Sequence, residues 1–293
     1  MKSIIKSPFK FDSVLLQKKS VSNINEMYLD KCNVDIREHF GDLENIELYE
    51  CKGTGYKFWY PFSLAGNERF YQKVSAAWSN YYRTDRWEYD VSQAYINKNS
   101  NVLEIGCGKG YFLKRLEEKG VKQAVGLDFN NEAIKSKITK FDILSKDLRG
   151  FESQQLFDVI CSFQVLEHIS DPMSFLEDCK SALNNGGLLI LSVPNNNYSP
   201  HKQMQDAFDL PPHHVGHYTS DILKKIAQVI DMNVLDIIEQ SVDFNHLAYR
   251  ERLGLLYKLA YLPLRIRHRV RNRTGHTVLL VLKKKSFSSC ITL

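Results

Sequence analysis

Short apolar runs alternate with amphipathic stretches from about residue 99 onward. Apolar runs of four to eight residues predict buried strands, whereas apolar positions three and four apart predict helices. Their alternation predicts βαβ units around a parallel sheet. The expected strands are 102–105, 123–127, 141–144, 157–163, 187–193, 234–241 and 276–283. The expected helices are 111–119, 131–137, 172–183 and 219–230, with Pro172 in a first turn and Thr219 as a helix N-cap.

The first 95 residues lack this alternation. Residues 1–50 are polar and weakly patterned, whereas residues 56–89 hold 12 aromatic residues in 34 positions, including all three tryptophans. Residues 67–80 have helical spacing. We therefore expect an aromatic-rich N-terminal cap, residues 1–95, packed on a second domain, residues 96–293. The same aromatic side chains are suited to forming a wall of a substrate pocket.

Composition places the chain among globular proteins. Its 293 residues are enough for a full α/β core and an additional segment. The apolar part of the first eight residues is too short for a signal peptide, and no run approaches the roughly 18 apolar residues of a membrane span. The six cysteines show no CxxC spacing, which favours free thiols and a reducing, cytoplasmic compartment.

The net charge of +5 is distributed unevenly. Residues 243–285 contain 11 Lys and Arg residues against two acidic ones, and the stretch 245–273 is both basic and amphipathic. We interpret about 243–273 as an insertion before the last strand. It suits peripheral contact with an anionic membrane surface or a lipid-linked pyrophosphate. The alternatives are a sugar nucleotide, RNA phosphates, or a packed helix with a solvated basic face.

A glycine-rich turn follows the first expected strand: Glu104-Ile-Gly106-Cys107-Gly108-Lys-Gly110. Glycines at a strand-to-helix turn let the backbone approach a ligand and direct helix N–H groups toward it. The spacing differs from the G-x-G-x-x-G dinucleotide fingerprint. The acid ahead of the first glycine suits a cationic cofactor that carries a nucleoside, such as S-adenosylmethionine.

Two further acids follow the next expected strands. Asp128 ends the second strand, where a carboxylate can accept both ribose hydroxyls. Asp147 follows the third strand, where it can accept from an adenine amino group. The fourth strand leads into Gln164-Val-Leu-Glu167-His168, and Asn184-Asn-Gly-Gly187 predicts a turn. Together and in this order, these features are more specific evidence for such a cofactor than any one of them alone.

In this order the features resemble those of class I S-adenosylmethionine-dependent methyltransferases, and most closely the small-molecule branch that includes ubiquinone-type O-methyltransferases. The resemblance covers roughly residues 99–240 and the last strand. It implies a doubly wound seven-stranded sheet, mostly parallel, with an antiparallel last strand. It also implies cofactor contacts at Glu104, Gly106, Cys107, Gly108, Gly110, Asp128, Phe129, Asp147, Leu148, Ser162, Phe163, Gln164 and His168.

The N-terminal part is also similar to that of methyltransferases of bacterial polysaccharide and sugar modification. The matching features are Cys32, the segment from Cys51 to Pro61, and the pair Phe70-Tyr71. Those relatives often carry a cysteine-rich zinc module. Only one cysteine is present at each end here, whereas a structural zinc site needs four ligands. We therefore expect no zinc at this module.

Methyl transfer is an in-line displacement that depends mainly on alignment in a dry pocket. An oxygen nucleophile also needs a base, which histidine can supply near neutral pH. Four histidines lie in the loop after the fifth strand, where such enzymes build the acceptor site: His201, His213, His214 and His217. We expect His213 or His214 to act as the base or to orient the acceptor. Alternatively, one of them orders the loop and the other is solvated.

A metal ion is a further interpretation of the histidines. Some relatives combine Glu-x-x-Glu-His with a later histidine to hold a divalent ion. Gln164 replaces the first of these carboxylates here, so we expect no metal ion. The alternative is a three-ligand site of Glu167, His168 and His214.

The resulting prediction is an S-adenosylmethionine-dependent enzyme that methylates a small or carrier-linked acceptor, above all a hydroxyl of a sugar or glycan precursor. A first rival is an RNA methyltransferase, which only the basic stretch supports. No Asn-Pro-Pro-Tyr-type motif follows the fourth strand, where Ser162-Phe-Gln-Val165 stands instead. A second rival is a non-catalytic cofactor-binding partner, against which the intact glycine turn and Asp128 argue.

Overall fold

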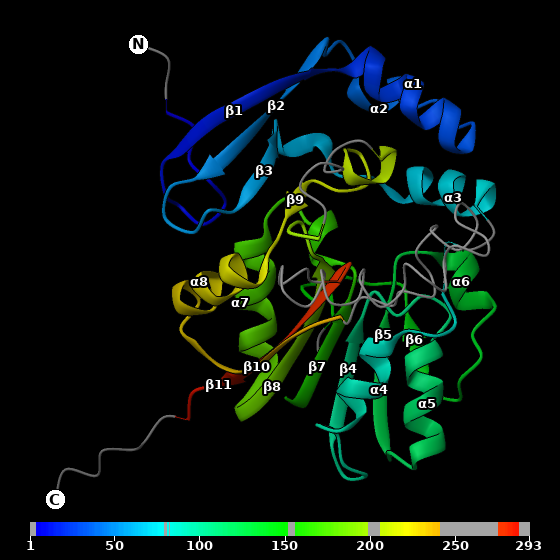
Figure 1. Ribbon diagram of the computed structural model, residues 1–293. Coiled ribbons are helices and arrows are strands. Elements are labelled where there is room, and N and C mark those ends of the chain that lie inside the picture. The colour runs from blue at the N-terminus through cyan, green and yellow to red at the C-terminus, as the bar shows by residue number, and fades with distance from the viewer. Residues whose placement is uncertain are drawn as a thin grey trace, which may run out of the picture.

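The computed structural model describes residues 4–78, 81, 83–151, 156–198, 206–240 and 275–286. Two sheets form the frame of the molecule (Figure 1). A seven-stranded sheet carries helices on both faces. A smaller, four-stranded antiparallel sheet, formed mainly by the N-terminal residues, lies at one end of the larger sheet.

The large sheet has the order β10-β11-β8-β7-β4-β5-β6. Its strands are β4 (Asn101–Ile105), β5 (Gln123–Leu127), β6 (Asp142–Leu144), β7 (Phe157–Phe163), β8 (Leu183–Pro194), β10 (Met232–Glu239) and β11 (Thr277–Lys284). The five strands from β8 to β6 are mutually parallel, whereas β11 runs antiparallel to both β8 and β10. The expected mostly parallel sheet with an antiparallel last strand is confirmed.

The expected helices also form, with ends that differ by at most two residues. They are α5 (Tyr111–Lys119), α6 (Asn131–Lys135), α7 (Pro172–Ala182) and α8 (Ser220–Val229). The Thr219 side chain accepts from the Ile222 N–H and so caps α8, as expected. Asp171 caps α7 in the same way, immediately before Pro172.

The inner strands β4, β7, β8 and β11 of the large sheet are largely buried, which explains their continuous apolar sequences. On β11, Val278, Leu280 and Leu282 belong to the buried cluster that includes α7 and α8. Leu279 and Val281 belong to the cluster on the opposite face, with α5 and α4 (Trp87–Gln93). The helix pairs lie on the two sides of the sheet in Figure 1.

One expected turn is absent. Asn184 to Gly187 lie inside β8, which begins at Leu183. The register with β7 jumps from Phe157 opposite Leu183 to Val159 opposite Leu188, so the intervening residues bulge out of the ladder. Gly186 takes a φ of +76° within this bulge. The turn-forming residues therefore bend a strand, and the prediction of a separate turn was wrong.

Residues 1–50, whose pattern predicted no regular element, form several helices and strands, and more follow before residue 78. They are β1 (Ser13–Ser20), α1 (Val21–Cys32), α2 (Arg37–Phe40) and β2 (Asn45–Cys51), followed by β3 (Lys57–Tyr60), the 3₁₀ turn η1 (Phe62–Leu64) and α3 (Glu68–Ala77). Most side chains of β1 are exposed, so the strand shows no alternation of apolar and polar residues. The sheet order is β1-β2-β3-β9, where β9 is Gly216–His217.

The loop that ends in β9 connects the large sheet to the N-terminal core. Ala207, Leu210 and Val215 pack in the N-terminal core, and the Tyr28 hydroxyl donates to the Leu210 carbonyl at 2.9 Å. Conversely, Tyr89 of α4 packs on the large sheet, 5.2 Å from the ring of Phe163. The domain boundary at residue 95 stays a prediction.

The basic insertion expected at about 243–273 and His201, one of the four loop histidines, lie outside the described residues. Within the described part of the chain, no helix is both long enough and apolar enough to cross a bilayer. The two N-terminal cysteines lie in separate surroundings. The Cys32 thiol donates to the Tyr28 carbonyl at 3.3 Å, whereas Cys51 accepts from the Ser7 hydroxyl at 3.2 Å.

Candidate functional site

The glycine-rich turn after β4 is bound tightly to the end of β5. The N–H groups of Gly106 and Cys107 both donate to the Leu127 carbonyl, at 2.8 and 3.2 Å. Gly106 has a φ of +73°, and a Cβ on it would lie 2.3 Å from Val165 Cγ2. This position therefore requires glycine both for its backbone conformation and for its close packing.

Asp128 connects the glycine turn to the next loop. Its Oδ2 accepts from the Gly108 N–H at 2.7 Å and its Oδ1 from the Asn130 N–H at 2.8 Å. Burial raises the pKa of Asp128, while these two hydrogen bonds act in the opposite direction. The carboxylate is thereby fixed at the carboxyl end of β5, as its expected role at the ribose requires.

Glu104 is a buried acid with unused acceptor capacity. It is 2% exposed, and its Oε2 has no hydrogen-bond partner among the described residues. Burial and the nearby charge of Asp128 raise the pKa of Glu104 well above its ordinary value. An unpartnered acceptor of this kind beside the glycine turn suits a ligand that brings a positive charge or an N–H donor.

The remaining predicted cofactor residues lie at the same edge of the sheet. Phe129, beside Asp128, is 59% exposed, and Asp147 after β6 accepts from the Gly150 N–H at 2.6 Å, with Leu148 next to it. The end of β7 supplies Ser162 and Phe163, both buried, followed by Gln164. The structure thus gathers at the ends of four strands the residues that the sequence predicted, including Cys107 and Gly110 in the turn. Their contacts with a cofactor stay a prediction.

A cavity of about 990 Å³ lies beside this edge. One side of it is formed by α3 and the segment after it, and the other by the beginnings of α5 and α6. Its lining includes Trp78, Tyr81, Arg83, Lys109, Tyr111 and Asn130. Because Trp78 and Tyr81 come from the aromatic-rich N-terminal segment, the geometry supports the expected aromatic wall of a ligand pocket.

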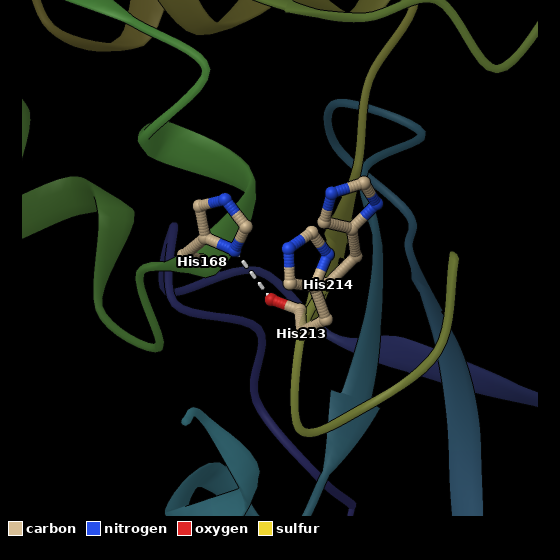
Figure 2. A group of neighbouring side chains, drawn as sticks. All are labelled: His168, His213 and His214. Atoms are coloured by element: carbon tan, nitrogen blue, oxygen red, sulfur yellow. Dashed lines mark hydrogen bonds between the residues drawn. The ribbon is translucent and has the colours of Figure 1, made fainter. Parts of the chain in front are cut away.

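Three histidines lie close together (Figure 2), and none of them is among the residues that line the cavity. His168 belongs to the 3₁₀ turn η2 (Leu166–His168) after β7, whereas His213 and His214 belong to the loop before β9. One ring nitrogen from each lies within 4.8 Å of the others. We call this group, together with Glu167, the histidine cluster.

The hydrogen bonds of the cluster define which ring nitrogens carry protons. His168 Nδ1 lies 2.5 Å from the His213 carbonyl, and His213 Nδ1 lies 3.1 Å from the carbonyl of Phe208. A carbonyl only accepts, so both Nδ1 atoms are donors. His214 Nδ1 lies 3.6 Å from the Asp209 carboxylate. In neutral His168 and His213, the proton on Nδ1 makes Nε2 the acceptor atom of the ring.

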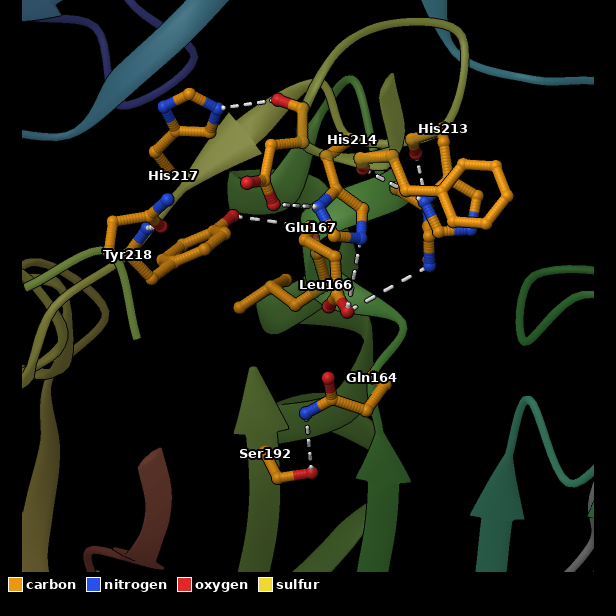
Figure 3. A network of polar contacts seen from close by, with 12 residues as sticks. Gln164, Leu166, Glu167, Ser192, His213, His214, His217 and Tyr218 are labelled. Atoms are coloured by element: carbon orange, nitrogen blue, oxygen red, sulfur yellow. Dashed lines mark hydrogen bonds and ion pairs between the residues drawn. The ribbon is translucent and has the colours of Figure 1, made fainter. Parts of the chain in front are cut away.

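Glu167 completes the cluster (Figure 3). It is 1% exposed, and its Oε1 lies 3.8 Å from His168 Nε2 and 4.0 Å from His214 Nε2. Burial raises the pKa of Glu167 to about 8, and lowers that of His168 to about 4 and those of His213 and His214 well below the ordinary value. The histidines are therefore neutral at pH 7.

His213 also contacts a residue that lines the cavity. Its Nε2 accepts from the hydroxyl of Tyr81 at 3.2 Å, and Tyr81 lines the cavity. Sequence reasoning did not assign a role to Tyr81 or Asp209. The only available signals were the aromatic run that contains Tyr81 and the position of Asp209 four residues before His213. Neither signal identifies a contact partner across the fold.

Comparison with known proteins identifies the family. Residues 80–237 match the family described as a methyltransferase domain, which is more than half of the chain. The chain belongs to this family. Its large sheet has the S-adenosylmethionine-binding fold of class I methyltransferases.

Relatives of the methyltransferase differ in their acceptors. A tRNA U34 carboxymethyltransferase of Alteromonas mediterranea is 34% identical over 127 residues, which are 38% of each chain. A ubiquinone biosynthesis O-methyltransferase of Vibrio vulnificus is 28% identical over 122 residues, 38% of this chain and 51% of the relative. The chain thus spans about half or less of the length of these relatives.

A solved structure shows the same fold. An S-adenosylmethionine-dependent methyltransferase from Mesorhizobium loti matches with a TM-score of 0.50 and 16% identity. The match covers 67% of this chain and 97% of that protein. It agrees with the architecture of the large sheet described above.

Proposed function

We propose that the enzyme transfers the methyl group of S-adenosylmethionine to a hydroxyl of a small or carrier-linked acceptor, and that this acceptor is a sugar or glycan precursor. The observation that carries the proposal is the contact between Tyr81 and His213 at the side of the cavity. It gives a bound hydroxyl a proton acceptor next to the edge that holds the cofactor.

The cofactor takes the following place in this proposal. Glu104 accepts from the ammonium group of its methionine part, and Asp128 accepts from the ribose hydroxyls. Phe129, Asp147 and Leu148 surround the adenine. Ser162, Phe163 and Gln164 lie beneath the sulfonium, with His168 nearby. These positions are supported by the common edge at which the four strands end.

The acceptor side is formed by the histidine cluster. An acceptor hydroxyl in the cavity would reach His213 Nε2 through the Tyr81 hydroxyl, and would pass its proton along this contact as its oxygen takes the methyl group. His214 orients this arrangement from the adjacent position. Aromatic side chains such as Trp78 and Tyr81 provide flat apolar surfaces of the kind that small-molecule pockets use.

A second candidate function is methylation of RNA. The specific observation in its favour is the 34% identity to a tRNA U34 carboxymethyltransferase. The matched part is 38% of either chain, so this similarity supports a shared donor side more directly than a shared acceptor.

The two candidates are separated by supplying methyl-labelled S-adenosylmethionine with fractionated nucleotide sugars, lipid-linked glycans and RNA. We expect label in a carbohydrate fraction. We also expect transfer to fall at least tenfold in His213→Gln and His214→Gln but not in His217→Gln, whose ring donates to the Asp209 carbonyl outside the cluster. Label confined to RNA would reverse the proposal.

A further inference from the structure

The cavity beside the donor edge is lined by two cationic side chains whose donors are unoccupied. Arg83 comes from the segment between α3 and α4, and Lys109 from the glycine-rich turn. Within the described part of the chain, neither side chain forms an ion pair or a hydrogen bond. Two unoccupied cationic donors in the lining of one cavity suit an anionic ligand, since hydrogen bonds between ionised groups are the strong ones.

The two acids of the cavity lining are already paired. Asp85 binds Arg115 at 2.5 Å, and Glu132 binds Lys135 at 2.7 Å. Arg115 also binds Asp90, at 2.5 Å. The charged residues of the lining and these partners comprise four cations and three acids, so their net charge is +1. The lining acids therefore do not cancel the attraction of the two lining cations for an anion.

Aromatic side chains of the lining suit the remainder of such a ligand. Trp78, Tyr81 and Tyr111 line the cavity, whose volume of about 990 Å³ is at the upper end for small-molecule sites. Trp78 is held by Phe208, whose ring centre lies 4.8 Å from its own, and by the Lys31 ammonium, 4.8 Å from the ring centre. Rigid flat rings of this kind contact a ligand with little loss of side-chain entropy.

The two cations lie next to the groups that the proposed reaction uses. Lys109 directly follows Gly108, whose N–H binds the carboxylate expected at the ribose. Arg83 is two positions after Tyr81, whose hydroxyl contacts His213. A ligand whose anionic group is bound by Arg83 and Lys109 would therefore place its other end near Tyr81 and the proposed proton acceptor.

The two walls of the cavity are joined by a direct contact. The side-chain amide of Asn131, at the start of α6, donates to the Glu68 carboxylate of α3 at 3.3 Å. The two helices lie close together in Figure 1, and both contribute residues to the lining. The N-terminal wall is thereby held at a fixed place relative to the glycine-rich turn.

From these observations we propose that the cavity binds the acceptor as a phosphate or diphosphate ester of a sugar, and that Arg83 and Lys109 hold its phosphate oxygens. Arginine can bind two oxygens of a phosphate at once, whereas lysine contributes a compact point charge. The flat rings of Trp78 and Tyr111 would contact the uncharged part of the ligand. A nucleoside diphosphate sugar and a lipid-linked sugar diphosphate share this chemistry.

The inference deepens the proposed function and rests on it only for the statement that the ligand is the methyl acceptor. Binding of a diphosphate to the cavity needs no methyl transfer, so it is measured independently of the reaction. If label reached a carbohydrate that carries no phosphate while diphosphates failed to bind, the inference would fail and the proposed function would stand.

The test is isothermal calorimetry of the full-length protein with inorganic pyrophosphate, with and without saturating S-adenosylhomocysteine. We expect one equivalent to bind under both conditions, with an affinity that falls as the salt concentration rises. Arg83→Gln and Lys109→Gln should each weaken binding at least about tenfold. Uridine diphosphate and geranyl diphosphate then distinguish the two sources, because the probe whose organic group fits the cavity should bind more tightly than pyrophosphate.

Lys114→Gln is the matched control, because Lys114 follows Lys109 by five positions but binds Glu117 at 3.4 Å and does not line the cavity. It should bind pyrophosphate as the wild type does, and circular dichroism confirms the folding of each variant. Folded wild-type protein that binds none of the three probes would overturn the proposal. Equal weakening in the control, or loss of pyrophosphate binding when S-adenosylhomocysteine is added, would also overturn it. So would a single-stranded RNA that binds more tightly than all three probes and needs the same two cations.

Discussion

Replacement of Asp128 by asparagine is a direct perturbation of the donor site. Asp128 accepts backbone N–H groups from Gly108 and Asn130 at 2.7 and 2.8 Å, so its side chain is held from both sides. Asparagine has the same shape but only one oxygen. Its amide NH₂ would face one of the two N–H donors, and this mismatch should lower the free energy of unfolding by about 1–3 kcal/mol.

The same substitution should also weaken the binding of S-adenosylmethionine. A hydrogen bond to a charged carboxylate contributes about 1.5–3 kcal/mol, against about 0.5–1.5 kcal/mol for a neutral pair. If Asp128 accepts both ribose hydroxyls, loss of its charge costs roughly 2–3 kcal/mol of binding free energy. This corresponds to a Kd for S-adenosylmethionine that is roughly 30- to 150-fold higher.

Asp158→Asn provides a matched control. Asp158 of β7 also accepts a backbone N–H, from Asn101 at 2.9 Å, and a side-chain amide from Asn184 at 2.8 Å, but it lies at the amino end of the strand. Isothermal calorimetry with S-adenosylmethionine and S-adenosylhomocysteine measures both variants, and thermal unfolding measures their stability. A folded Asp128→Asn protein that binds the donor within threefold of wild type would refute the ribose assignment.

Three further predictions concern the donor edge and the core. Gly106→Ala should lower the free energy of unfolding by about 2–5 kcal/mol, since it combines a positive φ with a 2.3 Å approach to Val165; an unchanged denaturation midpoint would contradict this. Ionised Glu104 favours a cationic ligand, so donor affinity should fall as the pH drops through the raised pKa of Glu104. Calorimetry across pH should show that Glu104→Gln abolishes this dependence, and an unaltered pH profile would argue against the ammonium contact. Leu103→Ala, fully buried in β4, should cost about 2–5 kcal/mol in chemical denaturation, whereas Val14→Ala, 45% exposed, should cost little; equal losses would be inconsistent with the described core.

The large sheet could be predicted because the features that mark its strands and helices lie within or next to each element in the sequence. Strands buried on both faces are continuous apolar runs, and helices such as α8 carry their capping residue in the adjacent sequence. β1 could not be predicted, because it exposes Val14, Leu15 and Leu16 and gains its stability by pairing with β2, far along the chain. In β8, the segment from Asn184 to Gly187 has the composition of a turn but forms a bulge. Pairing with the neighbouring strand decides between a turn and a bulge, and the local sequence does not show that pairing.

The donor edge was predictable for a similar reason. Parallel strands end at one edge, so residues that follow β4 and β5 necessarily lie close together. The acceptor side was predictable only in part. The sequence marks His213 and His214 as candidates, but Tyr81 lies 132 residues away from His213 and meets it only through the packing of the N-terminal core. The outer contact of His214 with Asp209 likewise depends on how the loop folds back.

The most direct test of the central claim is the chemical identity of the methylated product. Protein supplied with S-adenosylmethionine carrying a ¹³C-methyl group and with a carbohydrate-precursor extract should yield one new labelled compound. The account predicts that NMR places the ¹³C-methyl group on oxygen, as a methyl ether of a carbohydrate. A labelled methyl group on nitrogen or carbon, or label recovered only in added RNA, would contradict it.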